Sequence, residues 1–200
     1  MSDSTKPRIS RSPLKHKFTE STYRKAKPYL LRDFEGRCAY SLQHVERVGY
    51  RSIEVDHFNP NLKGLRRHEY SNLFPATRHS NGAKSDLWPS SELKKMGVRF
   101  LNPTKEQDYG VHIFEDAATH ELVGASPAGK YHIRCCDLNA PHLVQERRDR
   151  AQLSKILGDY FVTAKVTVSE LVDGKLVDAS SVLRAILATM IPPIVAPPKS

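Results

Sequence analysis

The sequence has few of the features that mark secreted or membrane-spanning proteins. Among its 200 residues are three cysteines, Cys38, Cys135 and Cys136, and this odd number with one adjacent pair is a poor disulfide framework. No stretch approaches the run of about 18 apolar residues that a transmembrane helix needs. The basic N-terminal segment has no apolar stretch behind it, so we expect no secretory signal. These absences predict a soluble cytoplasmic protein with reduced thiols and no membrane partner.

Acidic residues are scarce relative to basic ones. The chain has 31 Lys and Arg against 22 Asp and Glu, which gives a net charge of +9 and a pI near 9.5. Such a charge favours a polyanionic partner, and nucleic acid is the first candidate. Residues 1–28 contribute +6 of this charge and contain almost no apolar side chain before Tyr23. We therefore expect a flexible basic arm, either laid along a phosphate backbone or solvated.

The remaining patterns predict one α+β unit with extensions. Strand-like alternation covers residues 52–58, and the Asn59-Pro60-Asn61 turn follows it. Thr77 is a suitable N-cap for a helix over residues 77–86. We expect further elements in the chain on both sides of this stretch: a short helix over 20–34, strands at 111–114, 121–123 and 131–135, a loop over 124–129, helices from Pro141 to about 168 and over 178–190, and an extended Pro-rich tail over 191–200.

The Asp56-His57 pair at the end of the first of these strands carries the clearest chemistry. An imidazole is a good general base at neutral pH, and a carboxylate is a hard oxygen ligand suited to Mg²⁺. Together they supply two requirements of phosphodiester hydrolysis, activation of water and neutralisation of developing charge. Because adjacent side chains of a strand point to opposite sides, such a pair must sit where the strand ends or bends. The turn that follows His57 satisfies this condition.

The spacing of Asp56-His57, Asn72, Asn81 and Lys84 resembles the HNH endonucleases, which have a ββα-metal fold. The resemblance implies that His57 is the general base and that Asp56 and Asn81 bind Mg²⁺ or Mn²⁺. It also implies that Asn72 holds the loop that orients His57, and that Lys84 contacts a phosphate or braces the helix. The expected activity is cleavage of DNA by nicking, leaving 5′-phosphate and 3′-hydroxyl ends, and a homodimer could cut both strands.

The same stretch is basic around the proposed site. We expect the side chains that grip the nucleic-acid backbone to be Lys63, Arg66, Arg67, Arg78 and Lys84. The expected division of the chain is a basic arm over 1–28, an HNH core over 29–90, an extension over 91–190 that is first β-rich and then helical, and a tail over 191–200.

One departure from the family concerns its structural zinc. The four cysteine positions of many members correspond here to Cys38, Ser41, Thr77 and Ser80. A structural Zn²⁺ needs four ligands, normally Cys or His, and Ser and Thr cannot replace three of them. We therefore expect no structural zinc, and Cys38 should be a small core residue.

Beyond the core, two short segments, 99–103 and 137–144, together with Arg147, resemble the C-terminal part of HNH nuclease subunits of phage-defence operons of the Septu type. That resemblance implies a role in antiviral defence and an ATPase or other subunit as partner. Two alternatives stay open: a catalytically inactive HNH-fold subunit that binds nucleic acid, and an RNase. Trp88 is expected to anchor the core, with stacking on a base as the alternative.

Overall fold

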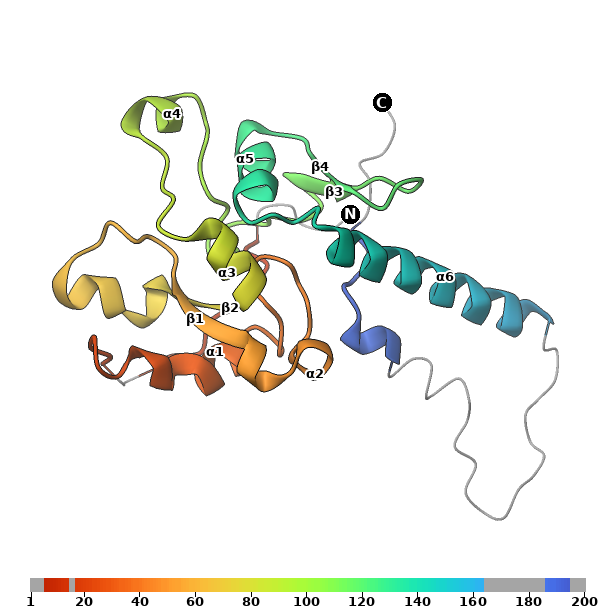
Figure 1. Cartoon of the computed structure of the whole chain (residues 1–200), viewed down its shortest axis with the longest axis horizontal. Helices are drawn as coiled ribbons and strands as arrows, with labels where there is room; N and C mark the ends of the chain where they lie inside the picture. Colours follow the sequence, from red (N-terminus) through yellow and green to blue (C-terminus); the bar gives the residue numbers. More distant parts are fainter. Residues whose placement is uncertain (1–5, 15–16, 164–185, 195–200) are drawn as a thin grey trace, which may run out of the picture.

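The computed structural model describes residues 6–14, 17–163 and 186–194, and within these ranges the chain mixes helix and strand, as expected for α+β (Figure 1). The strands are β1 (Ile53–His57), β2 (Leu73–Thr77), β3 (Ile113–Glu115) and β4 (Leu122–Gly124). The α-helices are α1 (Lys27–Asp33), α2 (Val45–Val48), α3 (Arg78–Lys84), α4 (Ser91–Lys95), α5 (Pro127–Cys135) and α6 (Pro141–Thr163). Short 3₁₀ helices are η1 (Tyr23–Ala26), η2 (Tyr50–Ser52), η3 (Gly64–His68) and η4 (Tyr70–Asn72).

Strands β1 and β2 form an antiparallel pair that is followed directly by α3. The register runs from Ile53 opposite Thr77 to His57 opposite Leu73. Helix α3 begins where expected because the Thr77 side chain accepts a hydrogen bond from the Ser80 backbone N–H, which caps the helix. The link between the strands contains η3 and η4 and spans residues 58–72. It reverses the chain direction, so that β2 pairs antiparallel with β1. The strand predicted over 52–58 and the helix predicted over 77–86 are confirmed within a few residues.

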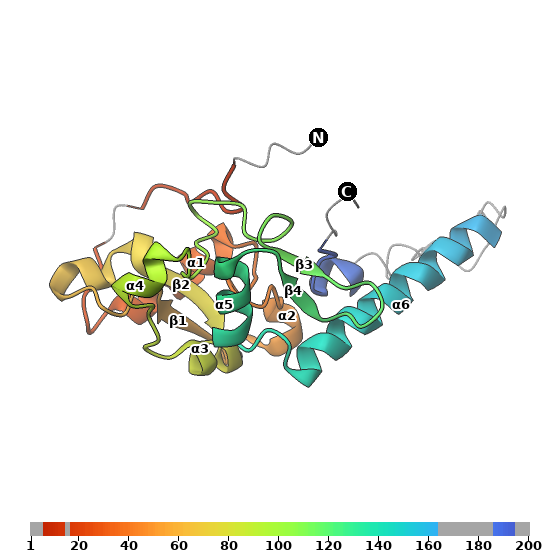
Figure 2. The ribbon, with the colours of Figure 1, turned by 90° about the horizontal axis from the view of Figure 1, so that it is seen from above.

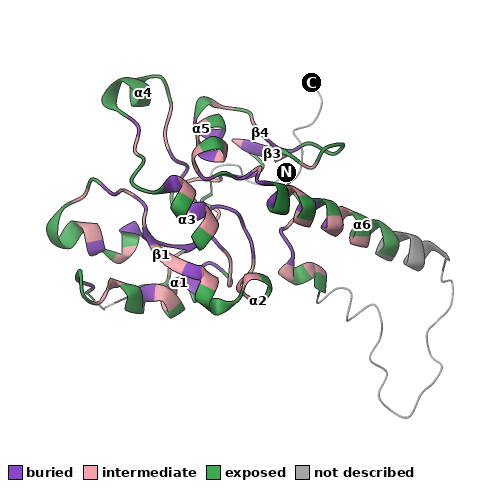
Figure 3. Cartoon of the chain, viewed as in Figure 1, coloured by how far each residue is buried: buried purple, intermediate pink, exposed green. Residues whose placement is uncertain are grey.

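Buried residues run along β2 and the segments that pack against it (Figure 3). The main core cluster among the described residues is rich in aromatic side chains. Phe74 of β2 lies 5.6 Å from Phe34 and 4.7 Å from Phe58 between ring centroids. The Trp88 ring lies 5.5 Å from Phe58 and 5.8 Å from Phe100. These contacts favour the anchoring role for Trp88, because large aromatic side chains in contact contribute most of their stabilisation through burial.

The strand predicted over residues 131–135 is wrong, since this segment belongs to helix α5. Ser126 caps that helix by accepting a hydrogen bond from the Gly129 N–H, and Pro127 occupies its first turn. The helix lies very close to the β3–β4 pair, where a Cβ added to Gly129 would be 2.1 Å from the His112 carbonyl oxygen. Glycine is needed there for this close approach, and the loop predicted over 124–129 is correspondingly shorter.

Helix α6 begins at Pro141, as expected, and extends away from the body of the protein (Figure 2). The predicted end of this helix near residue 168, most of the helix predicted over 178–190 and most of the 191–200 tail lie outside the described residues. Within the described ranges, no helix combines the length and the apolar character required to cross a bilayer.

The described part of residues 1–28 is packed against the core and does not form the predicted free arm. The Arg8 guanidinium lies 2.6 Å from an Asp108 carboxylate oxygen, and Arg11 donates to the Tyr70 and Leu73 carbonyl oxygens at 2.6 and 2.8 Å. Ile9 between them is buried. The prediction from composition failed because these arginines pair with a carboxylate and with backbone carbonyls inside the protein, which compensates the cost of burying their charge.

Candidate active site

The end of β1 borders a hollow of about 310 Å³. Its lining includes four of the predicted site residues: Asp56 and His57 from β1, Asn81 from α3, and Arg67 from the loop between the strands. Asp86, after α3, also lines it. Residues from both strand and helix thus meet at one open surface, and His57 is half-buried at its edge.

The His57 ring is contacted by two residues that the sequence motif does not include, His68 and Tyr23. Its Nε2 atom lies 3.0 Å from Nδ1 of His68, and Nε2 of His68 lies 2.9 Å from an oxygen of Glu20. The Tyr23 ring packs on both imidazoles, with centroids 4.6 Å from His57 and 5.6 Å from His68. The sequence gives no periodic signal for these contacts, because the partners come from segments far apart along the chain.

The protonation of His57 is set first by burial. Removal from water lowers the pKa of His57 to about 4, and the nearby positive charge of Arg67, together with His68, acts in the same direction. Glu20 acts in the opposite direction but does not outweigh these effects. His57 is therefore neutral at pH 7 and keeps a lone pair with which it can accept a proton.

Asn72 connects the two ends of the loop that follows His57. Its side-chain N–H groups donate to the Asn59 and Arg67 carbonyl oxygens at 3.2 and 2.9 Å. Its side-chain oxygen accepts from the Asn59 N–H at 2.9 Å. These bonds fix residues 59–67 next to His57, which is the contact pattern that a loop-holding role requires. Asn72 is buried and does not line the hollow, so it acts through the loop.

Lys84 is not available to nucleic acid, and the prediction that it contacts a phosphate is wrong. Its side chain is 0% exposed, and Nζ lies 2.9 and 3.2 Å from the two carboxylate oxygens of Asp56 and 3.1 Å from the His57 carbonyl oxygen. The Tyr40 hydroxyl also donates to Asp56. Lys84 therefore joins α3 to β1, because a buried ammonium group is tolerated only where a carboxylate and hydrogen bonds compensate its lost hydration.

Asn81, predicted to bind a metal together with Asp56, is hydrogen-bonded to Glu54. Its side-chain N–H donates to Glu54 at 2.7 Å, and Glu54 also lies 3.2 Å from the Arg78 guanidinium. With the amide nitrogen of Asn81 bonded to Glu54, its carbonyl oxygen is the atom left for a cation. Glu54 thus orients Asn81 and is a site residue that the motif did not indicate.

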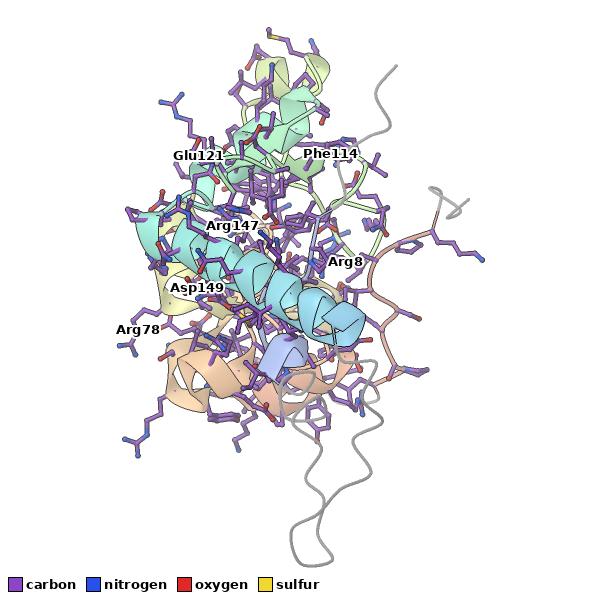
Figure 4. All side chains as sticks on the ribbon, turned by 90° about the vertical axis from the view of Figure 1, so that its right-hand side faces the viewer. Arg8, Arg78, Phe114, Glu121, Arg147 and Asp149 are labelled. Carbon is purple, nitrogen blue, oxygen red and sulfur yellow. The ribbon has the colours of Figure 1, made fainter. Side chains whose placement is uncertain are left out.

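Of the remaining basic residues of the predicted grip, Arg67 lines the hollow and the others do not. Arg67 donates to the Pro60 carbonyl oxygen at 3.0 Å. Lys63, just before η3, and Arg66, within it, are exposed. The Arg78 side chain is 75% exposed and extends outward from the start of α3, as Figure 4 shows. Arg67 is thus the basic residue of this set that the hollow contains.

The four positions that correspond to zinc ligands in the family lie together in a buried, hydrogen-bonded corner. The Cys38 sulfur accepts backbone N–H groups of Tyr40, Ser41 and Thr77 at 3.4, 3.3 and 3.3 Å. Its thiol lies 3.9 Å from the Thr77 hydroxyl oxygen, which in turn accepts from Ser80 N–H. Cys38 is fully buried, as expected. These hydrogen bonds hold the Cys38 turn against the start of α3.

The side chains at the hollow supply only part of the coordination shell of a divalent ion. Within the described residues, no group of three or more His, Cys, Asp or Glu side chains is arranged to hold a metal. The Asp56 carboxylate already receives Lys84 twice and Tyr40 once, which leaves about one of its roughly four lone-pair positions. With the Asn81 oxygen, that makes two ligands. Mg²⁺ commonly uses one or two protein carboxylates and completes its shell with water and substrate phosphate.

Comparisons of the chain with protein-family models, with curated proteins and with solved structures find no match. Its function is therefore argued from its own residues.

Proposed function

We propose that the chain hydrolyses phosphodiester bonds of DNA, with His57 as the general base. The observation that supports this most strongly is a neutral imidazole at the edge of an open hollow, with one ring nitrogen already hydrogen-bonded to His68. A general base needs an accessible lone pair and a fixed orientation. His57 lines the hollow and one of its ring nitrogens is held by His68, and Arg67, which also lines the hollow, would attract a phosphate.

In this mechanism, His57 takes a proton from a water molecule in the hollow. The water oxygen forms a bond to phosphorus, the bond from phosphorus to the 3′ oxygen breaks, and the leaving oxygen takes up a proton from solvent. A Mg²⁺ or Mn²⁺ ion bound by Asp56 and Asn81 would neutralise charge on the phosphate and on the leaving oxygen. The products would carry 5′-phosphate and 3′-hydroxyl ends.

The basic side chains place the strand. Lys63, Arg66 and Arg78 are exposed and would contact phosphates without reading bases. Binding through these contacts would weaken steeply with salt, because each neutralised phosphate releases counterions. Lys84 takes no part in this grip; its proposed role is to fix Asp56 and the position of α3.

Nicking of supercoiled plasmid tests the proposal. Wild type and His57→Ala are incubated with Mg²⁺, with Mn²⁺ or with EDTA, and RNA of matched length is assayed alongside. His79→Ala is the matched control, because His79 lies on α3 but pairs with Asp137 and does not line the hollow. We expect metal-dependent nicking by wild type and by the control, and none by His57→Ala. Preference for RNA would instead identify an RNase.

A second candidate, a nucleic-acid-binding subunit without cleavage, is favoured by one specific observation. Both oxygens of Asp56 are occupied by Lys84 and one also by Tyr40, so the proposed metal ligand is largely satisfied without a metal. In that case plasmid would stay intact under every ion. DNA affinity would be the same for wild type and His57→Ala and would not respond to EDTA.

A further inference from the structure

Three side chains from separate segments form one line of polar contacts that ends at the hollow: an ion pair between Glu20 and His68, and a hydrogen bond between His68 and His57. Glu20 precedes η1, His68 ends η3, and His57 ends β1. The line runs from Glu20 to His68 at 2.9 Å and from His68 to His57 at 3.0 Å. His68 is buried and Glu20 is exposed. In a neutral imidazole one ring nitrogen donates and the other accepts, so the proton position on one histidine determines the proton position on the next.

The direction follows from the carboxylate at one end. An ionised carboxylate can only accept, so Glu20, 2.9 Å from the Nε2 atom of His68, favours a proton on that nitrogen. In a neutral His68 the other nitrogen, Nδ1, then has the lone pair. That lone pair accepts from His57, and Nε2 of His57 must therefore be protonated. The proton-free nitrogen of His57 is then Nδ1.

The Tyr23 ring limits the alternatives. It packs against both imidazoles at 4.6 and 5.6 Å, and a turn of either ring would have to displace it. Tyr23 and Glu20 both belong to the N-terminal segment, so this segment forms one wall of the site and is more than a basic extension of the chain. The three residues fix both the plane of the His57 ring and the nitrogen that is free.

We infer that His68 and Glu20 are positioning residues that hold His57 in the tautomer with the proton on Nε2, so that Nδ1 is the proton-accepting atom. The catalytic consequence rests on the proposed function; the tautomer itself does not. His68 has the larger role because it is buried, whereas hydrogen bonds and ion pairs of an exposed carboxylate are weakened by water.

The tautomer is measured directly by ¹H–¹⁵N NMR correlation of ring nitrogens in the full-length chain at neutral pH, with His57→Gln used to assign the signals. We expect the Nε2–H pattern for His57 in wild type. His68→Ala removes the acceptor and should give a mixture of the two tautomers. His68→Asn is the conservative variant, because its side-chain oxygen can replace Nδ1 as acceptor, and it should keep the wild-type pattern.

Cleavage and DNA affinity are measured on the same variants. His68→Ala should lower the single-turnover rate by about 10- to 100-fold, the range seen when a group that orients a functional histidine is removed. DNA affinity should not change, and His68→Asn should restore most of the rate. Glu20→Ala should have a smaller effect in the same direction. Glu69→Ala, at an exposed neighbouring position, should have none.

Two results would overturn the inference: an Nδ1–H tautomer in wild type, or an unchanged tautomer and rate in a folded His68→Ala protein. The proposed function fails separately. If the wild-type chain cuts no nucleic acid but His57 shows the Nε2–H tautomer that is lost in His68→Ala, the positioning is right and the nuclease proposal is wrong. Amide spectra report whether each variant is folded.

Discussion

Two of the carboxylate–histidine pairs among the described residues have the same length but lie in very different settings. Glu20 and His68 lie 2.9 Å apart beside the hollow, and Glu115 and His120 lie 2.9 Å apart at the β3–β4 pair. In the second pair, Glu115 is buried and also bonded at 2.6 Å to Arg150, itself buried. The negative charge of Glu115 is thus already balanced by Arg150 inside the protein.

The first pair differs because His68 is hydrogen-bonded to a second imidazole, His57, which borders open space. The comparison teaches that a carboxylate next to a histidine does not by itself identify a site. What distinguishes the two is whether the contacts of the histidine lead to a side chain that lines a hollow. The β3–β4 cluster stabilises the fold, and the cluster at β1 is available for chemistry.

Removing His57 and His120 in turn should show the largest difference between the two clusters. We expect His57→Ala to lower the single-turnover rate of plasmid nicking by about 10²- to 10⁴-fold, the contribution of a positioned general base. His120→Ala should leave the rate of the folded protein unchanged. Equal losses in the two variants would show that the hollow has no special role.

The enclosed cluster should matter for stability instead. Arg150→Met leaves the Glu115 carboxylate buried without its cation, and loss of one partner of a buried ion pair costs about 3–5 kcal/mol. Urea unfolding at neutral pH measures this change. Arg148→Met, on an exposed position of the same helix α6, should change the unfolding free energy by less than about 0.5 kcal/mol. A small effect of Arg150→Met would mean that the cluster is solvated.

A comparison of His57 with His132, a buried histidine of α5, extends the account to pH. Burial lowers the pKa of both His57 and His132 to about 4, but His132 is fully enclosed. Because the unfolded chain binds a proton near pH 6.5 and the folded chain does not, stability should fall as pH drops from about 6.5 to about 4. At roughly 1.4 kcal/mol per pKa unit, His132 contributes about 3 kcal/mol of that loss.

Urea unfolding as a function of pH tests this point. His132→Asn keeps an acceptor for the Leu101 N–H, which His132 bonds at 3.1 Å, but removes the titration. We expect a shallower fall in unfolding free energy between pH 6.5 and 4 in this variant. A slope identical to that of wild type would exclude His132 as a source of acid sensitivity.

Asn72 should have the smallest effect on stability and a visible one on cleavage. Asn72→Ala removes the bonds to Asn59 and Arg67 that close the loop, at a cost of about 2 kcal/mol in unfolding free energy. Nicking by the folded variant should also slow, because the loop no longer fixes the surroundings of His57. Asn61→Ala, in the same loop but exposed, is the control for both measurements.

The sequence was sufficient to predict the β1 strand, the capped start of α3 and the meeting of Asp56, His57 and Asn81 at one hollow. These depend on local signals, alternation and an N-cap, and on the spacing of a known motif. Of the two roles predicted for Lys84, the phosphate contact was wrong and the bracing of the helix agrees with its contacts. Lysine is normally exposed, and only the packing of α3 on β1 places its ammonium group next to Asp56.

Contacts between distant segments account for the other differences. Nothing in the order of residues pairs Glu20 with His68 or His68 with His57, because such contacts have no period along the chain. Residues 131–135 alternate like a strand, yet Ser126 and Pro127 carry the start signal of helix α5, which outweighs the alternation.

Chemical rescue of His57→Gly tests the central claim most directly. This variant leaves a space where the side-chain imidazole was. Imidazole added to the solution can occupy this space and accept the proton in place of the side chain. We predict that His57→Gly binds DNA but does not nick it, and that nicking returns in proportion to added imidazole. Nicking by His57→Gly at the wild-type rate without imidazole would contradict the claim that His57 is the base.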